Sequence, residues 1–279
     1  MLSVVSLNCW NGRVFDPLMA FFTKMSPDVD VFCLQEVYST DICIGENFEA
    51  WSEDKKNRLD LLQEIEAVLP DHESYFMPTQ YGLEQEAEKF DSRVRRGTAV
   101  FVRRGLEILE VSATWIVNSA PEFGNKRRYL QTVHLKKDGV EYVVANYHGV
   151  WRGASKDDSP ERTTQSTNIV RVLERFWCHK ILVGDFNLLP NTRSIGIIED
   201  NGLIEGQTGQ LINLIKTHEV KTTRSSLLEK KRDVGDLVGG HALFADYAFV
   251  SPSLEVAEFR VLSDEVSDHL PLFLRCEGK

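Results

Sequence analysis

The sequence predicts an α/β protein, organised as one domain over residues 1–279. Segments with strand character alternate with amphipathic helical segments, and no linker-like stretch or shift in composition divides the chain. A length of 279 residues is enough to bury a large core, and 42% hydrophobic with 27% charged residues is typical of a globular protein. These values exclude fibrous, low-complexity and disordered classes.

The first elements are a strand, a helix and a second strand. The apolar, β-branched segment Leu2–Leu7 predicts the first strand, and Phe15–Met25 forms a helical run that closes before a proline. A short buried strand is expected over Val29–Leu34. Further on, apolar residues at three- and four-residue steps predict an amphipathic helix over Lys55–Leu69.

Strands predominate in the middle of the chain. They are expected over Thr98–Val102, Glu107–Val117, Tyr129–Leu135 and Glu141–Tyr147. The segment Lys137-Asp138-Gly139 between the last two is a typical hairpin turn. If this turn centres on Asp138, Arg128 lies opposite His148 at the open end of the hairpin.

The second half returns to alternation. Ser159 as N-cap and Pro160 at the first position begin a helix that is expected to run to Trp177. The following expected elements are a strand over Lys180–Gly184, a helix near Thr192–Asn201, a polar loop over Ser225–Gly240, and strands over Phe244–Val250, Glu255–Leu262 and Leu270–Arg275.

A weak internal repeat relates the two halves. A strand that ends in a polar residue, a helix, and a strand that ends in an acid run from Asn8 to Glu36 and again from His148 to Asp185. Two such units would place both acids at the carboxyl edge of parallel strands, where open α/β sheets bind ligands.

Charge and cysteine content restrict partners and location. The net charge of −10 gives no global attraction to nucleic acid or anionic lipid, so a polyanion must be held locally. The five cysteines are scattered without a C-x-x-C pair, which argues against a disulfide framework or a zinc site. Without a signal peptide or membrane segment in the sequence, we expect a cytoplasmic protein, and no obligate protein partner is indicated.

Polar residues gather at predicted strand ends, and these residues carry the candidate chemistry. They are Asn8, Glu36, His148, Asp185, Asn187, Asp268 and His269, with Asp246 inside an apolar strand. Each alone has a structural interpretation as a turn former, helix cap or satisfied histidine. Together they supply hard oxygen ligands for Mg²⁺ or Mn²⁺ and imidazoles for a charged phosphorus centre, as phosphate ester hydrolysis requires.

The carboxylate Asp246 needs a partner, because an unpaired buried carboxylate is costly. His269 is the expected partner, and the pairing is expected to orient the imidazole and raise its pKa.

In this order, the segments Gln35-Glu36, Gly184-Asp185-Phe186-Asn187 and Ser267-Asp268-His269 resemble the endonuclease/exonuclease/phosphatase superfamily, which shares the deoxyribonuclease-I-like fold. The resemblance extends from Asn8 to His269. It implies a four-layer α/β/β/α sandwich, in which two mixed β-sheets pack face to face with helices outside. It also implies hydrolysis of phosphate esters with a divalent metal ion.

The resemblance implies a role for each of several residues. Glu36 is similar to the principal metal ligand, with Asn8 and Asp268 beside it. Asp185 resembles the residue that orients the nucleophilic water, and Asn187 resembles a phosphate contact.

The histidines also have counterparts in the family. His148 is at the position of another phosphate contact. His269, backed by Asp246, is similar to the family's His-Asp pair and acts either as base or as electrostatic stabiliser.

Other residues near the motifs keep two interpretations. Arg128 either binds a phosphate oxygen or is a solvated member of a basic run. Arg162 and Gln165 are expected to brace the His148 loop. The aromatic residues Trp10, Tyr147, Trp151 and Phe186 either stack on a substrate ring or pack beneath the site, and packing is favoured.

Three functions are consistent with the sequence. The leading hypothesis is a Mg²⁺-dependent phosphodiester hydrolase of nucleic acid, either a nuclease or an end-processing enzyme. The second is a phospholipid or small phosphoester hydrolase, similar to sphingomyelinases or phosphatases. The third, an inactive binding scaffold, is disfavoured because the set of catalytic side chains is intact.

Overall fold

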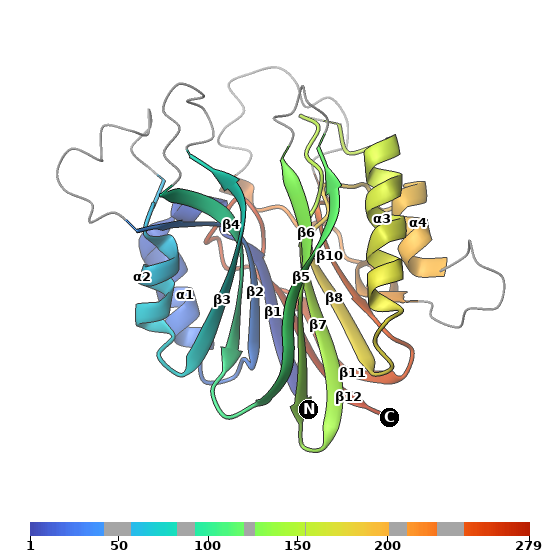
Figure 1. The fold of residues 1–279 in the computed structure, drawn as a ribbon, viewed down its shortest axis with the longest axis horizontal. Helices are drawn as coiled ribbons and strands as arrows, with labels where there is room; N and C mark the ends of the chain where they lie inside the picture. The colour runs from blue at the N-terminus through green and yellow to red at the C-terminus, as the bar shows by residue number, and fades with distance from the viewer. Residues whose placement is uncertain (42–56, 83–92, 120–125, 154, 201–210, 228–242) are drawn as a thin grey trace.

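The computed structural model describes residues 1–41, 57–82, 93–119, 126–153, 155–200, 211–227 and 243–279. Within them, two six-stranded mixed sheets pack face to face. Figure 1 shows helices α1 and α2 outside the first sheet and helices α3 and α4 outside the second. The four-layer α/β/β/α sandwich that the sequence predicts is therefore confirmed.

The first sheet has the order β11-β12-β1-β2-β4-β3, and the second has the order β5-β6-β7-β8-β10-β9. The strands of the first sheet are β1 (Leu2–Asn8), β2 (Val31–Thr40), β3 (His72–Tyr81), β4 (Val94–Arg103), β11 (Leu254–Val261) and β12 (Leu272–Gly278). Those of the second are β5 (Glu107–Asn118), β6 (Arg127–Lys137), β7 (Val140–His148), β8 (His179–Asp185), β9 (Ile212–Asn213) and β10 (Asp246–Val250).

The helices are η1 (Trp10–Gly12), α1 (Phe15–Met25), α2 (Leu61–Val68), α3 (Pro160–Leu173), α4 (Arg193–Asp200) and α5 (Leu214–Thr217). Helix α1 has the predicted bounds, and the side chain of Ser159 caps α3 by accepting a hydrogen bond from the backbone N–H of Arg162. Helix α3 ends at Leu173, short of the predicted end at Trp177. The predicted loop at Ser225–Gly240 lies mostly outside the described residues. The helix expected over Lys55–Leu69 begins only at Leu61: residues 57–60 are not helical, and Lys55 and Lys56 lie outside the described residues.

Strand β3 is absent from the sequence-based prediction. Most of its side chains are half-buried, so it lacks a clear alternation of apolar and polar residues. It also contains Pro78, which removes a backbone donor and lies where the pairing with β4 shifts by one residue. Its place at the end of the sheet order explains why this proline is tolerated.

Each sheet contains one parallel pair joined by a helix, which confirms the repeat seen in the sequence. Strands β1 and β2 are parallel, with Asn8 beside Gln35, and strands β7 and β8 are parallel, with His148 beside Asp185. The carboxyl ends of both pairs lie at the same edge of the sandwich, at the top in Figure 1. This edge carries the candidate site.

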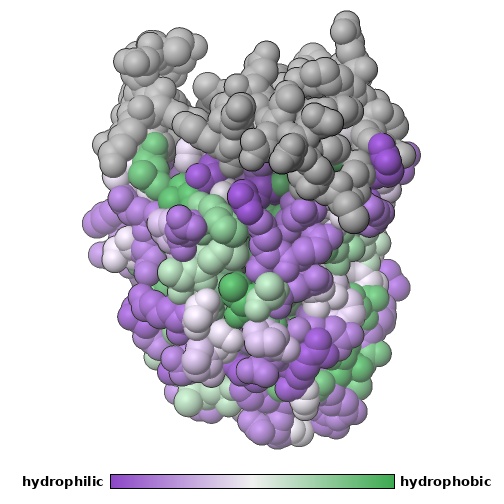
Figure 2. All heavy atoms as spheres, turned by 90° about the vertical axis from the view of Figure 1, so that its left-hand side faces the viewer, coloured by the Kyte–Doolittle hydropathy of each residue, from purple (hydrophilic) through white to green (hydrophobic). Residues whose placement is uncertain are grey.

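The outer surface on the side of α1 and α2 is mainly hydrophilic, with smaller apolar areas between the polar side chains (Figure 2). None of the helices in the described part of the chain combines the length and the apolar character needed to cross a lipid bilayer.

Candidate active site

A β-bulge presents Glu36 to the site. The pairing of β2 with β4 shifts between Gln35 and Val37, so Glu36 is the extra residue. Its φ of 56° is a left-handed conformation that a non-glycine residue seldom adopts. The carboxylate lies 2.7 Å from Nη2 of Arg96 and 3.7 Å from Nε2 of His148. Burial alone would raise the pKa of Glu36, but the charges of Arg96 and His269 and a hydrogen bond from Asn8 lower it to about 2.

Gly184 allows Asp185 to reach the site at the end of β8. Gly184 has a φ of 142°, and a Cβ atom there would lie 1.9 Å from the carbonyl oxygen of Tyr147. Only glycine is compatible with both constraints. Two residues further, Asn187 takes a φ of 54° and donates its backbone N–H to Oδ1 of Asp185 at 2.9 Å. This turn holds both side chains at the sheet edge.

Asp185 is the centre of the site. Its Oδ2 accepts hydrogen bonds from Nδ2 of Asn8 at 3.0 Å and Nδ2 of Asn187 at 3.3 Å. Nε2 of His148 and Nε2 of His269 each lie 3.8 Å from the same oxygen. Side chains from both sheets thus converge on one buried carboxylate, as the sequence-based hypothesis requires.

His269 and Asp246 form the predicted pair. Asp246 lies directly opposite Asp185 in the β10–β8 ladder, and its Oδ2 is 2.8 Å from Nδ1 of His269. The expected rise in the pKa of His269 is wrong, however. Burial and the nearby charge of Arg224 lower it to about 4, and burial raises the pKa of Asp246 to about 7. Desolvation outweighs the pairing, so the neutral imidazole is favoured in the free protein.

His148 is also held neutral. Burial and the charges of Arg128 and Arg96 lower its pKa well below the usual value. Together with His269, it presents an Nε2 atom toward Asp185. A negative charge that enters the site would raise the pKa of both imidazoles and favour their protonation.

A buried amide pair supports the site from below and joins the two sheets. Nε2 of Gln35 donates to Oδ1 of Asn146 at 2.7 Å. Asn146 in turn donates to the carbonyl oxygens of Leu34 and Ala99 at 3.0 and 3.2 Å. Both amide side chains are fully buried. This bridge fixes the strand that carries Glu36 relative to the strand that carries His148.

Arg128 lies in the site, although the predicted register is wrong by one residue. The turn consists of Asp138 and Gly139, so Leu130 pairs with Tyr147 and Arg128 is offset from His148. Its side chain is only 3% exposed, and its Nε atom has no hydrogen-bond partner. Among the described residues it makes no ion pair, and burial lowers its pKa. A solvated arginine is therefore excluded.

Three cationic side chains in the site are not among the residues that the sequence predicts. They are Arg96, Lys156 and Arg224. Arg224 contacts the imidazole of His269 and lies 3.0 Å from Oδ2 of Asp268, and Lys156 Nζ lies 3.4 Å from Oδ1 of Asn187. Only Arg96 has a sequence signal, since it belongs to the basic run Arg93-Val94-Arg95-Arg96.

Arg162 and Gln165 brace the loop after His148, as expected. Arg162 donates to the carbonyl oxygens of Val150, Ser155 and Asp157, and Oε1 of Gln165 accepts from the backbone N–H of Val150.

Two of the four aromatic residues pack beneath the site. Tyr147 and Phe186 are fully buried, with ring centroids 5.6 Å apart, while Trp151 is half exposed. Packing is therefore confirmed for this pair.

One set of side chains in the described part of the chain brings its ligand atoms close enough together for a metal ion. Asp185, Asp246 and His269 have ligand atoms within 4.8 Å of one another. In this set Nδ1 of His269 is already bonded to Asp246, so the group is better described as a hydrogen-bonded pair beside Asp185. The expected ligands Glu36, Asn8 and Asp268 carry oxygen atoms of the kind that Mg²⁺ or Mn²⁺ prefers, and the lowered pKa keeps Glu36 ionised. In this structure the two carboxylates are paired with Arg96 and Arg224.

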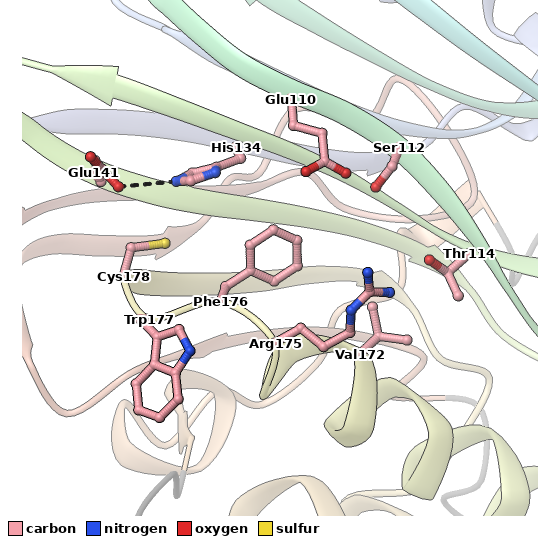
Figure 3. A pocket seen from close by; sticks show the side chains of 10 residues that line it. All are labelled: Glu110, Ser112, Thr114, His134, Glu141, Val172, Arg175, Phe176, Trp177 and Cys178. Carbon is pink, nitrogen blue, oxygen red and sulfur yellow. Dashed lines mark ion pairs between the residues drawn. The ribbon is translucent and has the colours of Figure 1, made fainter.

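A cavity of about 330 Å³ lies away from this site (Figure 3). It is lined by β5, the ion pair of His134 with Glu141, and the end of α3 with Phe176 and Trp177. None of the predicted catalytic residues lines it, so it is separate from the strand-end cluster.

Two mixed sheets that gather carboxylates, amides, imidazoles and guanidinium groups at one edge define the class of α/β-sandwich phosphoesterases. The model of the Endonuclease/Exonuclease/phosphatase family matches residues 5–269, and the chain belongs to this family. No match was found among curated proteins.

Solved structures share the fold along the whole chain. A mannosyl-6-phosphatase from Bacteroides thetaiotaomicron is 18% identical with a TM-score of 0.65, and the match covers 99% of this chain and 100% of that one. A family protein from Leptotrichia buccalis is 16% identical with a TM-score of 0.68, covering 99% and 100%. The human Nocturnin catalytic domain with bound sulfate is 17% identical with a TM-score of 0.60, covering 100% and 93%.

Proposed function

We propose that this chain is a divalent-metal-dependent phosphoester hydrolase whose reaction centre is Asp185. The observation that carries the proposal is Arg128, a buried cation without an ion-pair partner among the described residues, whose charge interacts with that of Asp185. Two imidazoles and two amides surround the Asp185 carboxylate. An unpaired buried charge is costly, so such a cation indicates an anionic ligand. A phosphate group would supply the missing acceptor oxygens.

In this proposal, Asp185 orients the attacking water. Asn187, His148 and His269 hold the phosphate, and Arg128 binds one of its non-bridging oxygens. The neutral imidazoles can take up a proton as negative charge develops, and Asp246 holds His269 in a fixed orientation through Nδ1.

Glu36, with Asn8 and Asp268, would hold the Mg²⁺ or Mn²⁺ ion. When bound, such an ion neutralises charge on the phosphoryl oxygens. Arg96 holds the Glu36 carboxylate from one side, so the ligand is already positioned. The Arg224 guanidinium holds the Asp268 carboxylate in the same way.

The leading substrate class is nucleic acid, cleaved at a phosphodiester or processed at an end. A second class, small phosphoesters, is favoured by the ion pairs of the basic segments Arg93-Val94-Arg95-Arg96 and Arg103-Arg104, which could otherwise guide a polynucleotide backbone. Arg95 pairs with Asp41, Arg96 with Glu36, and Arg103 with Asp30, so these residues do not form a free basic track for a polynucleotide backbone. A phosphatase among the structural neighbours agrees with this class.

A substrate screen tests the proposal. Purified protein is incubated with labelled single- and double-stranded DNA and RNA, sphingomyelin, and sugar and nucleoside phosphates, with Mg²⁺ or Mn²⁺. We expect hydrolysis that EDTA abolishes and that added metal restores. Absence of hydrolysis throughout the panel would favour the inactive scaffold instead.

We further propose that the chain acts as one domain in the cytoplasm without an obligate protein partner. Cys9, Cys33, Cys178 and Cys276 are free thiols, and three of them are buried, which suits a reducing compartment.

A further inference from the structure

Lys156 and Arg224 reach the two side chains that the proposed function assigns to the phosphate. Lys156 Nζ lies 3.4 Å from Oδ1 of Asn187, and the guanidinium of Arg224 contacts the imidazole of His269. The second Nη atom of Arg224 lies 3.0 Å from Oδ2 of Asp268. Two additional cations therefore contact the side chains that surround Asp185.

The position of Lys156 is fixed by its own loop. Its carbonyl oxygen accepts a hydrogen bond from the backbone N–H of Leu189 at 2.9 Å. Arg162, only 1% exposed, holds the carbonyl oxygens of the residues on both sides, Ser155 and Asp157, at 2.9 and 2.6 Å. Because the backbone is anchored on three consecutive residues, the lysine belongs to a built site and differs from a solvated surface lysine.

Some donors of these cations are unused. Nε of Arg224 is buried without a hydrogen-bond partner, as is Nε of Arg128. Lys156 forms no ion pair within the described part of the chain, and its one side-chain contact near Asp185 is the long one to Asn187. The site therefore holds more cationic donors than its own carboxylates occupy.

This excess distinguishes the two classes of phosphate ester. A phosphodiester offers two non-bridging oxygens and a single negative charge. A phosphomonoester offers three non-bridging oxygens and carries about −1.5 to −2 charges at neutral pH. Asn187 and Arg128 already provide amide and guanidinium donors for the two non-bridging oxygens of a diester, which leaves Lys156 and Arg224 for the third oxygen and the second charge.

We infer that the scissile group is a phosphomonoester and that Lys156 and Arg224 are the substrate-binding residues that select it. The inference rests on the proposed function and specifies its substrate class. Water forms the new P–O bond, the ester P–O bond breaks, and the leaving oxygen takes a proton, so that an alcohol and inorganic phosphate are released. A phosphorylated end of a nucleic acid and a free sugar phosphate share this chemistry.

Matched substrates and matched variants test the inference. The substrates are p-nitrophenyl phosphate, bis(p-nitrophenyl) phosphate, a 5′-phosphorylated oligonucleotide and glucose 6-phosphate, each with Mg²⁺. The variants are Lys156→Met, Arg224→Met and Lys156→Arg. The control is Lys24→Met, which removes an exposed cation that pairs with Asp264 on the outside of the sandwich.

We expect the wild type to prefer monoesters. Lys156→Met and Arg224→Met should each lower kcat/KM for monoesters by about 10- to 100-fold, the range for one charge-assisted hydrogen bond. In Lys156→Met the diester rate should change by less than about threefold. Arg224→Met also removes the contact to Asp268 and should lower both rates, the monoester rate more strongly. Lys156→Arg should restore most of the monoester rate. The ratio of kcat/KM for the oligonucleotide to kcat/KM for the sugar phosphate shows whether the natural monoester is a nucleic-acid end or a small molecule.

Two results would overturn the inference. One is a wild-type preference for the diester, and the other is an equal loss of both activities in the two variants. If no substrate is hydrolysed, the proposed function fails separately, and calorimetric binding of inorganic phosphate decides the inference. Binding that Lys156→Met weakens about 10-fold or more supports the subsite, and binding that it leaves unchanged refutes it.

Discussion

The buried arginine of the site predicts that one substitution has opposite effects on stability and activity. In Arg128→Met, a buried cation without an ion-pair partner among the described residues is replaced by an apolar side chain of similar length. Such replacements are neutral or stabilise proteins by about 1–4 kcal/mol. The charges of Asp185 and Glu36 offset part of the cost of burial, so we expect a gain of about 1–2 kcal/mol.

The same change should damage catalysis. Loss of a donor to charge that develops in the transition state costs about 10²–10³ in kcat. Stability is measured by urea unfolding followed by fluorescence, with thermal unfolding as a second probe. For a chain of this length, each kcal/mol corresponds to about 2–4 °C in Tm. Activity is measured as kcat/KM on the best substrate of the screen.

Arg127→Met is the matched control, because the neighbouring arginine is exposed and its loss removes the same formal charge. It should change stability and kcat/KM little. The reasoning is refuted if Arg128→Met destabilises the protein and leaves kcat/KM at the wild-type value, since Arg128 would then have a structural role.

Three further predictions concern the site and its support. Asp185→Ala and His269→Ala should lower kcat by at least about 10³-fold while circular dichroism shows a folded protein; wild-type rates would reject their roles. Burial lowers the pKa of Lys156 to about 8, so the lysine is charged below that pH and loses its proton above it. Activity on monoesters should therefore fall as pH rises through about 8, and Lys156→Arg, which stays charged, should remove this limb; an unchanged profile would contradict the assignment. Asn146→Leu removes the buried bridge between the sheets and should lower the free energy of unfolding by about 2–4 kcal/mol in urea titrations, and a loss below about 0.5 kcal/mol would show that the bridge is not needed.

The parts of the site that depend on local pattern and topology can be predicted from the sequence. The sequence places Glu36 and Asp185 at strand ends, and parallel strands joined by helices bring their carboxyl ends to one edge. These two facts are sufficient to place both acids together. Asp185 does end β8, whereas Glu36 is a bulged residue inside β2, just after the parallel pairing with β1 stops at Gln35. The His269–Asp246 pair is predictable because an acid in an apolar strand requires a partner.

Properties that arise from three-dimensional burial cannot be predicted in this way. Arg224 follows two threonines in a polar segment, and nothing in that pattern indicates that its guanidinium contacts His269. The predicted sign of the pKa shift of His269 is wrong for the same reason, since desolvation is known only when the surrounding atoms are placed. The hairpin register differs by one residue because a D-G pair fits a turn of either two or three residues.

The division of the site between the two sheets has a consequence for folding. Asn8 and Glu36 belong to one sheet, whereas His148 and Asp185 belong to the other, and the contacts between them cross the interface. Neither half of the chain can assemble a working centre by itself. Enzyme turnover is therefore a direct reporter of sheet docking, and during refolding it should return only with the last step that brings the two layers into register.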